Sequence, residues 1–295
     1  MKVLVTGATG LIGGAVARRL AGAGHDVLGL ARSEASADRL ARAGFAVRRG
    51  DLAAPESVAS AARAVDAVVH AASPNDGTAA ARDEAATRAL LGALRGTGKR
   101  LLYTSGCLVY GPTGDEPATE RRAPNPVALV RWRQPLEAEI LGAAAEGCHP
   151  VVIRPAWVYG NGGGTAEMMV GAAREHGAAR RIGAGANRWT AVHADDLADL
   201  YALALERAPA ASVFNGASGA AVPLAAIARA ASEAAGAEGR VVEWPLAEAR
   251  QALGPFADAI ACDQVISGDL ARRDLGWRPS RPGIVEELRA GAAGL

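Results

Sequence analysis

Three glycines follow the first predicted strand at a spacing that suits phosphate binding. In the segment LysValLeuValThrGlyAlaThrGlyLeuIleGly, which begins at Lys2, they are Gly7, Gly10 and Gly13. Gly7 permits a tight turn, Gly10 lets the backbone approach a pyrophosphate because it has no Cβ, and Gly13 lets the following helix pack close to the strand. The helix N-terminus then offers free N–H groups and a positive dipole end to the phosphates. The strand before these glycines and the helix after them therefore predict a dinucleotide-binding site.

The end of the second predicted strand bears on the choice of dinucleotide. NAD-binding proteins usually carry an acid there, which holds the ribose hydroxyls, but here the strand Val27–Ala31 is followed by Arg32 and Ser33. An arginine fork and a hydroxyl suit a 2′-phosphate, and the missing acid removes repulsion against it. The sequence therefore predicts NADPH/NADP⁺ as the cofactor. The alternative is that Arg32 is an ordinary solvated side chain.

Short β-branched segments alternate with apolar-periodic, alanine-rich stretches over the first half of the chain. Such alternation predicts βαβ units and a parallel sheet that binds ligands at the carboxyl ends of its strands. We therefore expect an α/β fold with a Rossmann-type, doubly wound parallel sheet. The predicted strands are Val3–Thr6, Val27–Ala31, Ala46–Arg49, Ala67–Ala71, Arg100–Thr104 and Val151–Arg154, and the predicted helices lie at about residues 11–23, 34–43, 55–64, 78–96 and 135–147.

The pattern changes after the sixth predicted strand. A glycine-rich loop at Gly160–Gly164, a helical stretch, a basic segment at Arg180–Ile182 and a helix from Asp195 follow one another. We expect a small mixed C-terminal substrate cap built from several segments. Residues 1–160 would form the dinucleotide-binding core, and residues 161–295 mainly the substrate-binding cap, with some segments returning to the core.

Composition and charge narrow the class of protein. The 295 residues are 50% hydrophobic and 21% charged with a net charge of +1, which allows a large core and gives no electrostatic case for nucleic acid or an anionic membrane. The chain has no apolar run of the ~20 residues needed to cross a bilayer and no signal-peptide pattern. Cys107, Cys148 and Cys262 lack metal-like spacing, which predicts reduced thiols in a cytoplasmic protein and no metal site. We expect a monomer or homodimer that acts on a small molecule.

Further segments carry a family resemblance. Gly50–Leu52 follows the third strand, His70–Ser73 closes the fourth, Ile153–Gly160 follows the sixth, and Val192–Ala198 and Leu275–Pro279 come later. Together with the glycine loop, these segments resemble the extended short-chain dehydrogenase/reductases, the NAD(P)-dependent epimerase/dehydratase-like group, in order and over nearly the whole chain. The resemblance implies the fold and the cofactor. It does not settle the activity, because the group includes epimerases, dehydratases, reductases and non-catalytic cofactor sensors.

The resemblance also implies which residues contact the cofactor. An aspartate after the third strand typically meets the adenine, and small residues after the fourth strand line the dinucleotide. The expected cofactor-binding residues are Gly7, Thr9, Gly10, Leu11, Ile12, Gly13, Arg32, Ser33, Asp51, Leu52, Ala71, Ala72, Ser73, Thr104, Arg133, Pro155, Ala156 and Val158.

The usual catalytic motif of this family is missing. Its members usually act through a Ser and a Tyr-x-x-x-Lys, in which the lysine lowers the tyrosine pKa from about 10 so that the phenol exchanges a proton with the substrate oxygen. The four tyrosines of this chain have no lysine four residues later: they are Tyr103, Tyr110, Tyr159 and Tyr201. The resemblance therefore extends to atypical members without the triad, which include ketoreductases of aromatic polyketides of the angucyclinone type.

Alignment on Glu137 places Leu129 at the tyrosine position and Arg133 at the lysine position, and Pro135 predicts that the helix begins near that residue. Arginine hardly gives up its proton at neutral pH, but it can stabilise a developing oxyanion or anchor the cofactor. Gly106 occupies the serine position, and Ser105 lies one residue away. Ser105 and Arg133 are therefore the predicted catalytic residues.

Other side chains each have a functional and a structural interpretation. Tyr110 and Tyr159 could donate a proton, although packing in loops is favoured. His193 with Asp195 suggests a base and its orienting acid, but the favoured interpretation is a helix start with Asp195 as its cap. Cys107 is expected to be a small buried residue near the nicotinamide.

Three tryptophans, Trp132, Trp157 and Trp189, fall in segments expected to face the substrate. Their flat rings suit an aromatic ligand, and core packing explains each equally well. Nearby arginines, Arg131, Arg133 and Arg188, could contact an anionic or phenolic group, the alternative being an ordinary solvated surface.

Three functions fit this sequence. The first is NADPH-dependent reduction of a ketone or quinone carbonyl on a small molecule, expected to be an aromatic polyketide of antibiotic biosynthesis. The proton would come from water, from Ser105 or from the substrate's own phenol. The second is a non-catalytic NADP(H)-binding sensor or regulatory protein. The third is a nucleotide-sugar epimerase or dehydratase, whose chemistry generally needs the absent tyrosine as a base.

Overall fold

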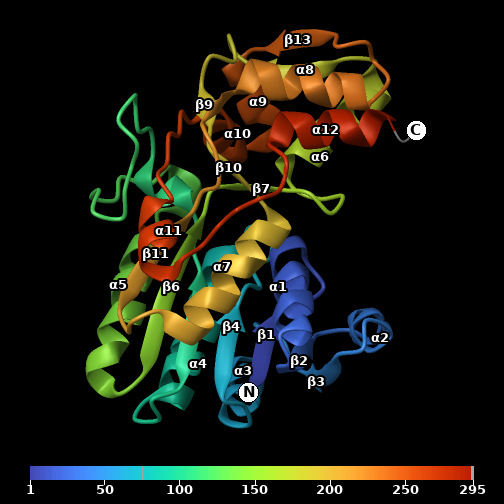
Figure 1. Ribbon diagram of the computed structural model, residues 1–295. Helices are drawn as coiled ribbons and strands as arrows, with labels where there is room; N and C mark the ends of the chain where they lie inside the picture. The colour runs from blue at the N-terminus through green and yellow to red at the C-terminus, as the bar shows by residue number, and fades with distance from the viewer. Residues whose placement is uncertain (75, 294–295) are drawn as a thin grey trace.

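Seven parallel strands form the central sheet of the molecule (Figure 1). The computed structural model describes residues 1–74 and 76–293, and the strand order is β11-β6-β5-β4-β1-β2-β3. The chain winds outward from β1 in both directions, so that ligands are expected at the switch point between β1 and β4. The strands are β1 (Lys2–Thr6), β2 (Asp26–Ala31), β3 (Ala46–Arg49), β4 (Ala67–His70), β5 (Arg100–Thr104), β6 (His149–Pro155) and β11 (Ser212–Gly216).

The predicted doubly wound α/β fold is confirmed, and six of the seven strands lie where the sequence places them, within two residues at either end. The seventh strand, β11, was not predicted. Its five residues, SerValPheAsnGly, include only two apolar side chains, Val213 and Phe214, which is too short a run to distinguish a strand from a loop.

Helices cover both faces of the sheet because side chains alternate along each strand. In β1, Val3 and Val5 belong to one buried cluster and Leu4 to the other. The first cluster is closed by α1 (Leu11–Gly22), α2 (Glu34–Arg42), α7 (Ala194–Arg207) and α11 (Asp269–Leu275), and the second by α3 (Pro55–Arg63), α4 (Ala79–Leu94) and α5 (Arg133–Gly142).

Helix α5 begins at Arg133, two residues before the predicted start at Pro135. Pro135 lies in the first turn, where a backbone N–H has no intrahelical partner in any case, so the proline does not interrupt the helix. Leu129 lies in a preceding 3₁₀ turn, η2 (Ala128–Val130), and its side chain is exposed.

The remaining elements form a cap beyond the carboxyl ends of the strands (Figure 1). Not all of residues 161–295 belong to this cap, because α7, β11 and α11 pack with the central sheet. The cap consists of β7 (Trp157–Tyr159), α6 (Thr165–His176), β8 (Ala179–Ile182), β9 (Arg188–Trp189), β10 (Ala191–His193), β12 (Val222–Pro223), α8 (Leu224–Ala234), β13 (Val241–Trp244), α9 (Leu246–Leu253), α10 (Pro255–Ala261) and α12 (Ile284–Ala293).

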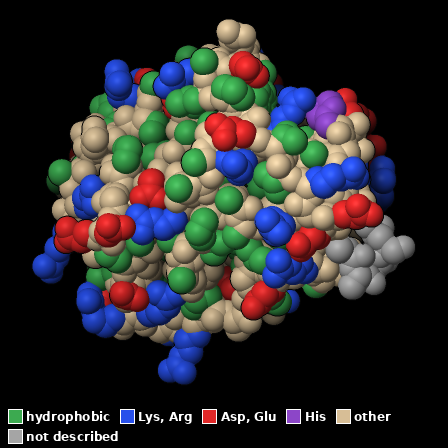
Figure 2. Space-filling model, turned by 90° about the horizontal axis from the view of Figure 1, so that it is seen from above, with side chains coloured by type: hydrophobic (Ala, Val, Ile, Leu, Met, Phe, Trp, Pro, Cys, Tyr) green, Lys and Arg blue, Asp and Glu red, His purple; other side chains and the backbone are tan. Residues whose placement is uncertain are grey.

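The cap end of the molecule carries acidic and basic side chains interspersed with one another (Figure 2). In the part of the chain that the structure describes, no helix combines the length and the apolar character needed to span a membrane, and no group of His, Cys, Asp and Glu side chains has the arrangement of a metal site. Cys107, Cys148 and Cys262 are free thiols, and all three are buried.

A buried ion pair joins α5 to β6. The side chains of Arg154 and Glu137 are 6% and 4% exposed, and Arg154 Nε donates to both carboxylate oxygens of Glu137 at 3.1 Å. Arg154 Nη1 also donates to the Tyr110 hydroxyl at 2.8 Å, and this hydroxyl donates to Asn215 Oδ1 on β11 at 2.8 Å. The pair therefore connects α5, β6, β11 and the 3₁₀ turn η1 (Cys107–Tyr110).

Replacing Glu137 by Gln should destabilise the protein by about 3–5 kcal/mol, because the buried Arg154 charge would lose its carboxylate. The free energy of unfolding from urea denaturation measures this. A matched control is Glu139→Gln on the same helix, whose partner is Arg88 and whose side chain is 41% exposed; it should cost no more than about 1 kcal/mol. Equal losses in the two variants would contradict a structural role for the buried pair.

Candidate functional site

A first cavity of about 460 Å³ opens at the carboxyl ends of β1, β2, β3 and β4. It contains ten of the predicted cofactor-binding residues: Gly7, Thr9, Gly10, Arg32, Ser33, Asp51, Leu52, Ala71, Ala72 and Ser73. The cavity therefore collects, from four strand ends, residues that are far apart in the sequence.

The glycine turn beneath this cavity leaves no room for side chains. Gly7 has a φ of +71°, and a Cβ on Gly13 would lie 2.3 Å from the Gly7 carbonyl oxygen. Gly10 is the N-cap of α1 and offers no capping side chain, so that the first N–H groups of the helix are free to bind an anion. This backbone cradle fits the pyrophosphate of a dinucleotide.

Three arginines reach the first cavity: Arg32 after β2, Arg39 on α2 and Arg82 on α4. Within residues 1–74 and 76–293, none of them forms a salt bridge. Asp76 lines the same cavity; hydrogen bonds from Thr78, with the charges of Arg82 and Arg32, lower the pKa of its carboxyl. The lining thus holds three guanidinium groups and two carboxylates, Asp51 and Asp76, and the described residues form no salt bridge with these guanidinium groups.

Sequence reasoning identified Arg32 but missed Arg39 and Arg82, because a polar position on a helix carries no signal of what it faces. Ser33 lines the cavity as predicted, but its hydroxyl also caps α2 by accepting a hydrogen bond from Ser36 N at 3.2 Å. Asp51 lines the cavity with one carboxylate oxygen accepting from Ala53 N at 3.0 Å.

A buried chain of hydrogen bonds supports the wall at Ala71 and Ala72. Thr6 Oγ1 accepts from both of their N–H groups, at 3.1 and 3.2 Å, so its own hydrogen must be donated to His70 Nδ1 at 2.8 Å. His70 therefore carries its proton on Nε2, which faces Asp83 Oδ1 at 3.4 Å. Burial raises the pKa of Asp83, but hydrogen bonds from His70 and Tyr103, with the charge of Arg133, outweigh it, so the net pKa is lowered.

A second cavity of about 210 Å³ lies at the carboxyl ends of β5 and β6, on the other side of the α1 N-terminus. Both predicted catalytic residues, Ser105 and Arg133, line it. So do four predicted cofactor-binding residues: Ile12, Pro155, Ala156 and Val158. Both cavities thus open at the same edge of the sheet, where this type of fold binds its ligands.

Three predicted cofactor-binding residues line neither cavity. Gly13 lies behind the glycine turn. Leu11 packs against the loop at Gly163 and Gly164. Thr104 bonds Tyr201 through its hydroxyl at 2.6 Å, and its carbonyl accepts from Arg133 Nη1 at 2.8 Å. These residues hold the walls in place.

Ser105 and Arg133 differ in how they are held. The Ser105 side chain is buried, with 7% exposure of the residue, and its hydroxyl has no hydrogen-bond partner in the described structure. The Arg133 guanidinium lies 4.7 Å from the Trp132 ring centroid and is tied to the Thr104 carbonyl. The cavity wall therefore carries one fixed positive charge and one hydroxyl with unused hydrogen-bonding capacity.

None of the four tyrosines lines the second cavity. All are buried, and burial raises the pKa of each phenol. These phenols stay protonated at neutral pH and are engaged inside the protein. The hydroxyls of Tyr103, Tyr110, Tyr159 and Tyr201 bond, respectively, Asp83 (3.2 Å), Asn215 (2.8 Å), the Pro282 carbonyl (2.5 Å) and Thr104 (2.6 Å).

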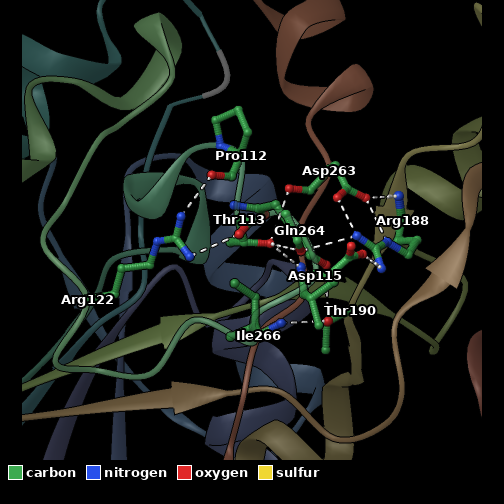
Figure 3. A network of polar contacts seen from close by, with 11 residues as sticks. Pro112, Thr113, Asp115, Arg122, Arg188, Thr190, Asp263, Gln264 and Ile266 are labelled. Carbon is green, nitrogen blue, oxygen red and sulfur yellow. Dashed lines mark hydrogen bonds and ion pairs between the residues drawn. The ribbon is translucent and has the colours of Figure 1, made fainter.

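The turn that follows Ser105 is held by Gln264, which lines the second cavity and for which the sequence offered no motif. Gln264 Nε2 donates to the carbonyls of Cys107 at 2.8 Å and Gly111 at 3.3 Å. Figure 3 shows the polar network that continues from Gln264 to the segment after this turn and includes Thr113, Arg188 and Asp263. In this network, Arg188 Nη2 donates a hydrogen bond to Asp263 Oδ2 at 2.7 Å.

The sequence leaves open whether Arg188 contacts a ligand and whether His193 acts as a base with Asp195 or marks a helix start. Arg188 is tied to Asp263 and Asp115 in this network and is not in the second cavity. The sequence predicts Asp195 as the N-cap of α7, but the N-cap is His193, whose Nδ1 accepts a hydrogen bond from Asp195 N at 3.1 Å. His193 therefore has the favoured structural role at a helix start, with the cap two residues earlier than predicted.

The tryptophans divide between the cavity and the core. Trp157 lines the second cavity, and Trp189 is fully buried behind it, with the ring centroids 4.0 Å apart and an interplanar angle of 14°. Trp132 packs against the core cluster of α4 and α5. Of the three tryptophans, only Trp157 lines the second cavity, and Cys107 beside it is buried as expected.

Comparisons with known proteins agree with this geometry. Residues 3–216 match the NAD dependent epimerase/dehydratase family. An uncharacterized protein of Schizosaccharomyces pombe is 31% identical, with 99% of each chain covered. A 2-alkyl-3-oxoalkanoate reductase of Stenotrophomonas maltophilia is 28% identical over 70% of this chain and 66% of its own length.

Among solved structures, a UDP-glucose 4-epimerase of Thermus thermophilus in complex with NAD superposes with a TM-score of 0.81 at 23% identity, covering 99% of this chain and 98% of that one. This likeness shows the same fold. From the family match, the chain belongs to the NAD-dependent epimerase/dehydratase family within the extended short-chain dehydrogenase/reductases.

Proposed function

We propose that the protein uses NADPH to reduce a ketone or quinone carbonyl on a small molecule. The observation that carries this proposal is the pairing of Ser105 and Arg133 in the second cavity, where a buried hydroxyl without a partner lies on the same wall as a fixed guanidinium. A reacting carbonyl oxygen needs hydrogen-bond donors and positive charge as it becomes negative. The similarity to a 2-alkyl-3-oxoalkanoate reductase supports reduction as the reaction type.

The free arginines of the first cavity support NADPH over NADH. Arg32, Arg39 and Arg82 line the cavity where the end of β2 meets α2, and no acid in the described residues forms a salt bridge with them. A 2′-phosphate would supply the missing anion, and a guanidinium binds phosphate with paired, charge-assisted hydrogen bonds. Gly7, Gly10 and the α1 N-terminus would hold the pyrophosphate.

The protein's own groups act on the carbonyl oxygen. The chemistry that a bound NADPH would supply is a hydride for the carbonyl carbon; a proton added to the oxygen would complete the alcohol. Arg133 stabilises the negative charge that develops on this oxygen. Ser105 holds the oxygen and passes it a proton, which water or a phenol of the substrate replaces. Trp157 offers a flat apolar surface to an aromatic substrate, consistent with the polyketide class expected from the sequence.

The solved relatives support one alternative. A UDP-glucose 4-epimerase and a dTDP-glucose 4,6-dehydratase have the same fold, so nucleotide-sugar chemistry is the competing proposal. The four buried, hydrogen-bonded tyrosines count against it, because none is placed to act as a base in the second cavity. Nucleotide-sugar retained by the purified protein would favour it. Tight NADPH binding without turnover of any carbonyl compound would favour a sensor.

Replacing Arg32 by Ala should weaken NADPH binding by about 10- to 100-fold, because one charged hydrogen-bond donor to the 2′-phosphate is lost. NADH binding should stay within about twofold, since NADH lacks that phosphate. Fluorescence titration with each nucleotide measures both. Arg42→Ala is the matched control, because Arg42 lies nearby at the end of α2 and outside the cavity. Equal weakening of both nucleotides would contradict a 2′-phosphate site at Arg32.

Replacing Ser105 by Ala should lower kcat for NADPH-dependent ketone reduction by about 100-fold while the melting temperature is unchanged, because the hydroxyl makes no hydrogen bond within the protein. NADPH oxidation with a panel of aromatic ketones and quinones provides the assay. Failure of the wild-type protein to oxidise NADPH with any of them would overturn the proposed function. Full activity of the variant would remove Ser105 from the mechanism.

A further inference from the structure

The indole nitrogen of Trp157 is a buried donor without an acceptor. Trp157 lines the second cavity, and its Nε1 has no hydrogen-bond partner in the described structure. The ring is held by stacking on Trp189 at 4.0 Å and by Phe256 at 6.5 Å. Buried N–H groups almost always have partners in folded proteins. A rigid, unpaired donor in the wall of a cavity therefore points to an acceptor on a ligand.

Gln264 supplies the complementary group. Both hydrogen-bond partners of its amide nitrogen are carbonyl oxygens, those of Cys107 and Gly111. Because carbonyl oxygens only accept hydrogen bonds, Nε2 must face them and Oε1 must face away. In the described structure Oε1 accepts no hydrogen bond, although the residue is 1% exposed and lines the second cavity. An acceptor is thus available to a ligand in the same wall as the Trp157 donor.

The remainder of the wall defines the charge of the ligand. Arg133 is the only charged residue among those that line the second cavity, and no acid is present there. The other side chains are mainly apolar, as in Ile12, Val130 and Val158. A diphosphate would meet a single cation in this wall, whereas a neutral, flat compound with two oxygen functions would use every polar group.

We propose that the second cavity selects a neutral carbonyl compound that also carries a hydroxyl group. This inference rests on the proposed reduction and names its substrate class. The carbonyl oxygen accepts hydrogen bonds from Ser105 and Arg133. The hydroxyl oxygen accepts from Trp157 Nε1, and the hydroxyl hydrogen is donated to Gln264 Oε1. Trp157 and Gln264 are then specificity-determining residues that act on the hydroxyl group and not on the reacting carbonyl.

The test compares 1-tetralone with its monohydroxylated isomers and their methyl ethers. The best hydroxytetralone should have a kcat/KM at least about 10-fold above those of 1-tetralone and of its own methyl ether, because a site with unpaired polar groups rejects the analogue that leaves them unpaired. Trp157→Phe keeps a ring on Trp189 and removes the N–H with part of the ring contact. It should lower kcat/KM for this hydroxytetralone about 10-fold more than kcat/KM for 1-tetralone, because only the hydroxylated substrate loses a hydrogen bond in addition to part of the ring contact.

Two controls separate recognition from folding. Trp244→Phe, in the cap and outside the second cavity, should leave both substrates unaffected. The melting temperature of Trp157→Phe should not fall, because the lost donor has no partner within the protein. An equal loss for 1-tetralone and the hydroxytetralone would show that Trp157 supports the cavity without recognising the hydroxyl, and would overturn the inference.

Calorimetry in the presence of NADP⁺ distinguishes this inference from the proposed function. If no ketone is reduced but a hydroxytetralone binds about 10-fold more tightly than 1-tetralone, the recognition inference stands and the proposed reduction fails. If 1-tetralone is reduced and bound as well as every hydroxylated isomer, the reduction stands and the inference fails.

Discussion

The close contact between Gly13 and the Gly7 carbonyl is the constraint on which the site depends. A Cβ on Gly13 would lie 2.3 Å from that oxygen, so only glycine allows α1 to begin directly against the end of β1. This contact places the uncapped N-terminus of α1 at the switch point of the sheet, with Gly10 in the first cavity and Ile12 in the second. Both cavities are therefore organised by one backbone approach.

Near the glycine turn, some buried polar groups hold the cavity walls by hydrogen bonds, and other polar groups in the walls have no hydrogen-bond partner. Thr6 and His70 fix the turn at Ala71, and Gln264 fixes the turn after Ser105. Thr6 and Gln264 each bond two backbone groups, and His70 accepts from the Thr6 hydroxyl, which rigidifies the site. The unpaired groups, Ser105 Oγ and Trp157 Nε1, lie in the wall of the second cavity. This division between satisfied supports and unsatisfied wall groups is what we expect of a preorganised binding site.

Motifs with fixed spacing made the glycine turn and most of the first cavity predictable, because their chemistry depends on backbone geometry encoded over a few residues. Arg82 and Gln264 were not predictable, since each reaches its cavity through packing between segments distant in sequence. The short strand β11 had too little apolar pattern. The helix start at Arg133 and the cap at His193 each lie two residues before the predicted position. Pro135 is tolerated inside the first turn of α5, and the His193 side chain itself caps α7.

The central claim is that carbonyl reduction proceeds here without a titrating tyrosine acid, and the pH dependence of kcat/KM tests it most directly. Burial raises the pKa of all four tyrosines, and neither a serine hydroxyl nor an arginine ordinarily titrates near neutrality. For a substrate without an ionisable group, the account predicts a kcat/KM that is flat between about pH 6 and pH 9. A tenfold fall per pH unit above an apparent pKa of about 7–9 would contradict it, because such a limb reports the loss of a protonated catalytic acid.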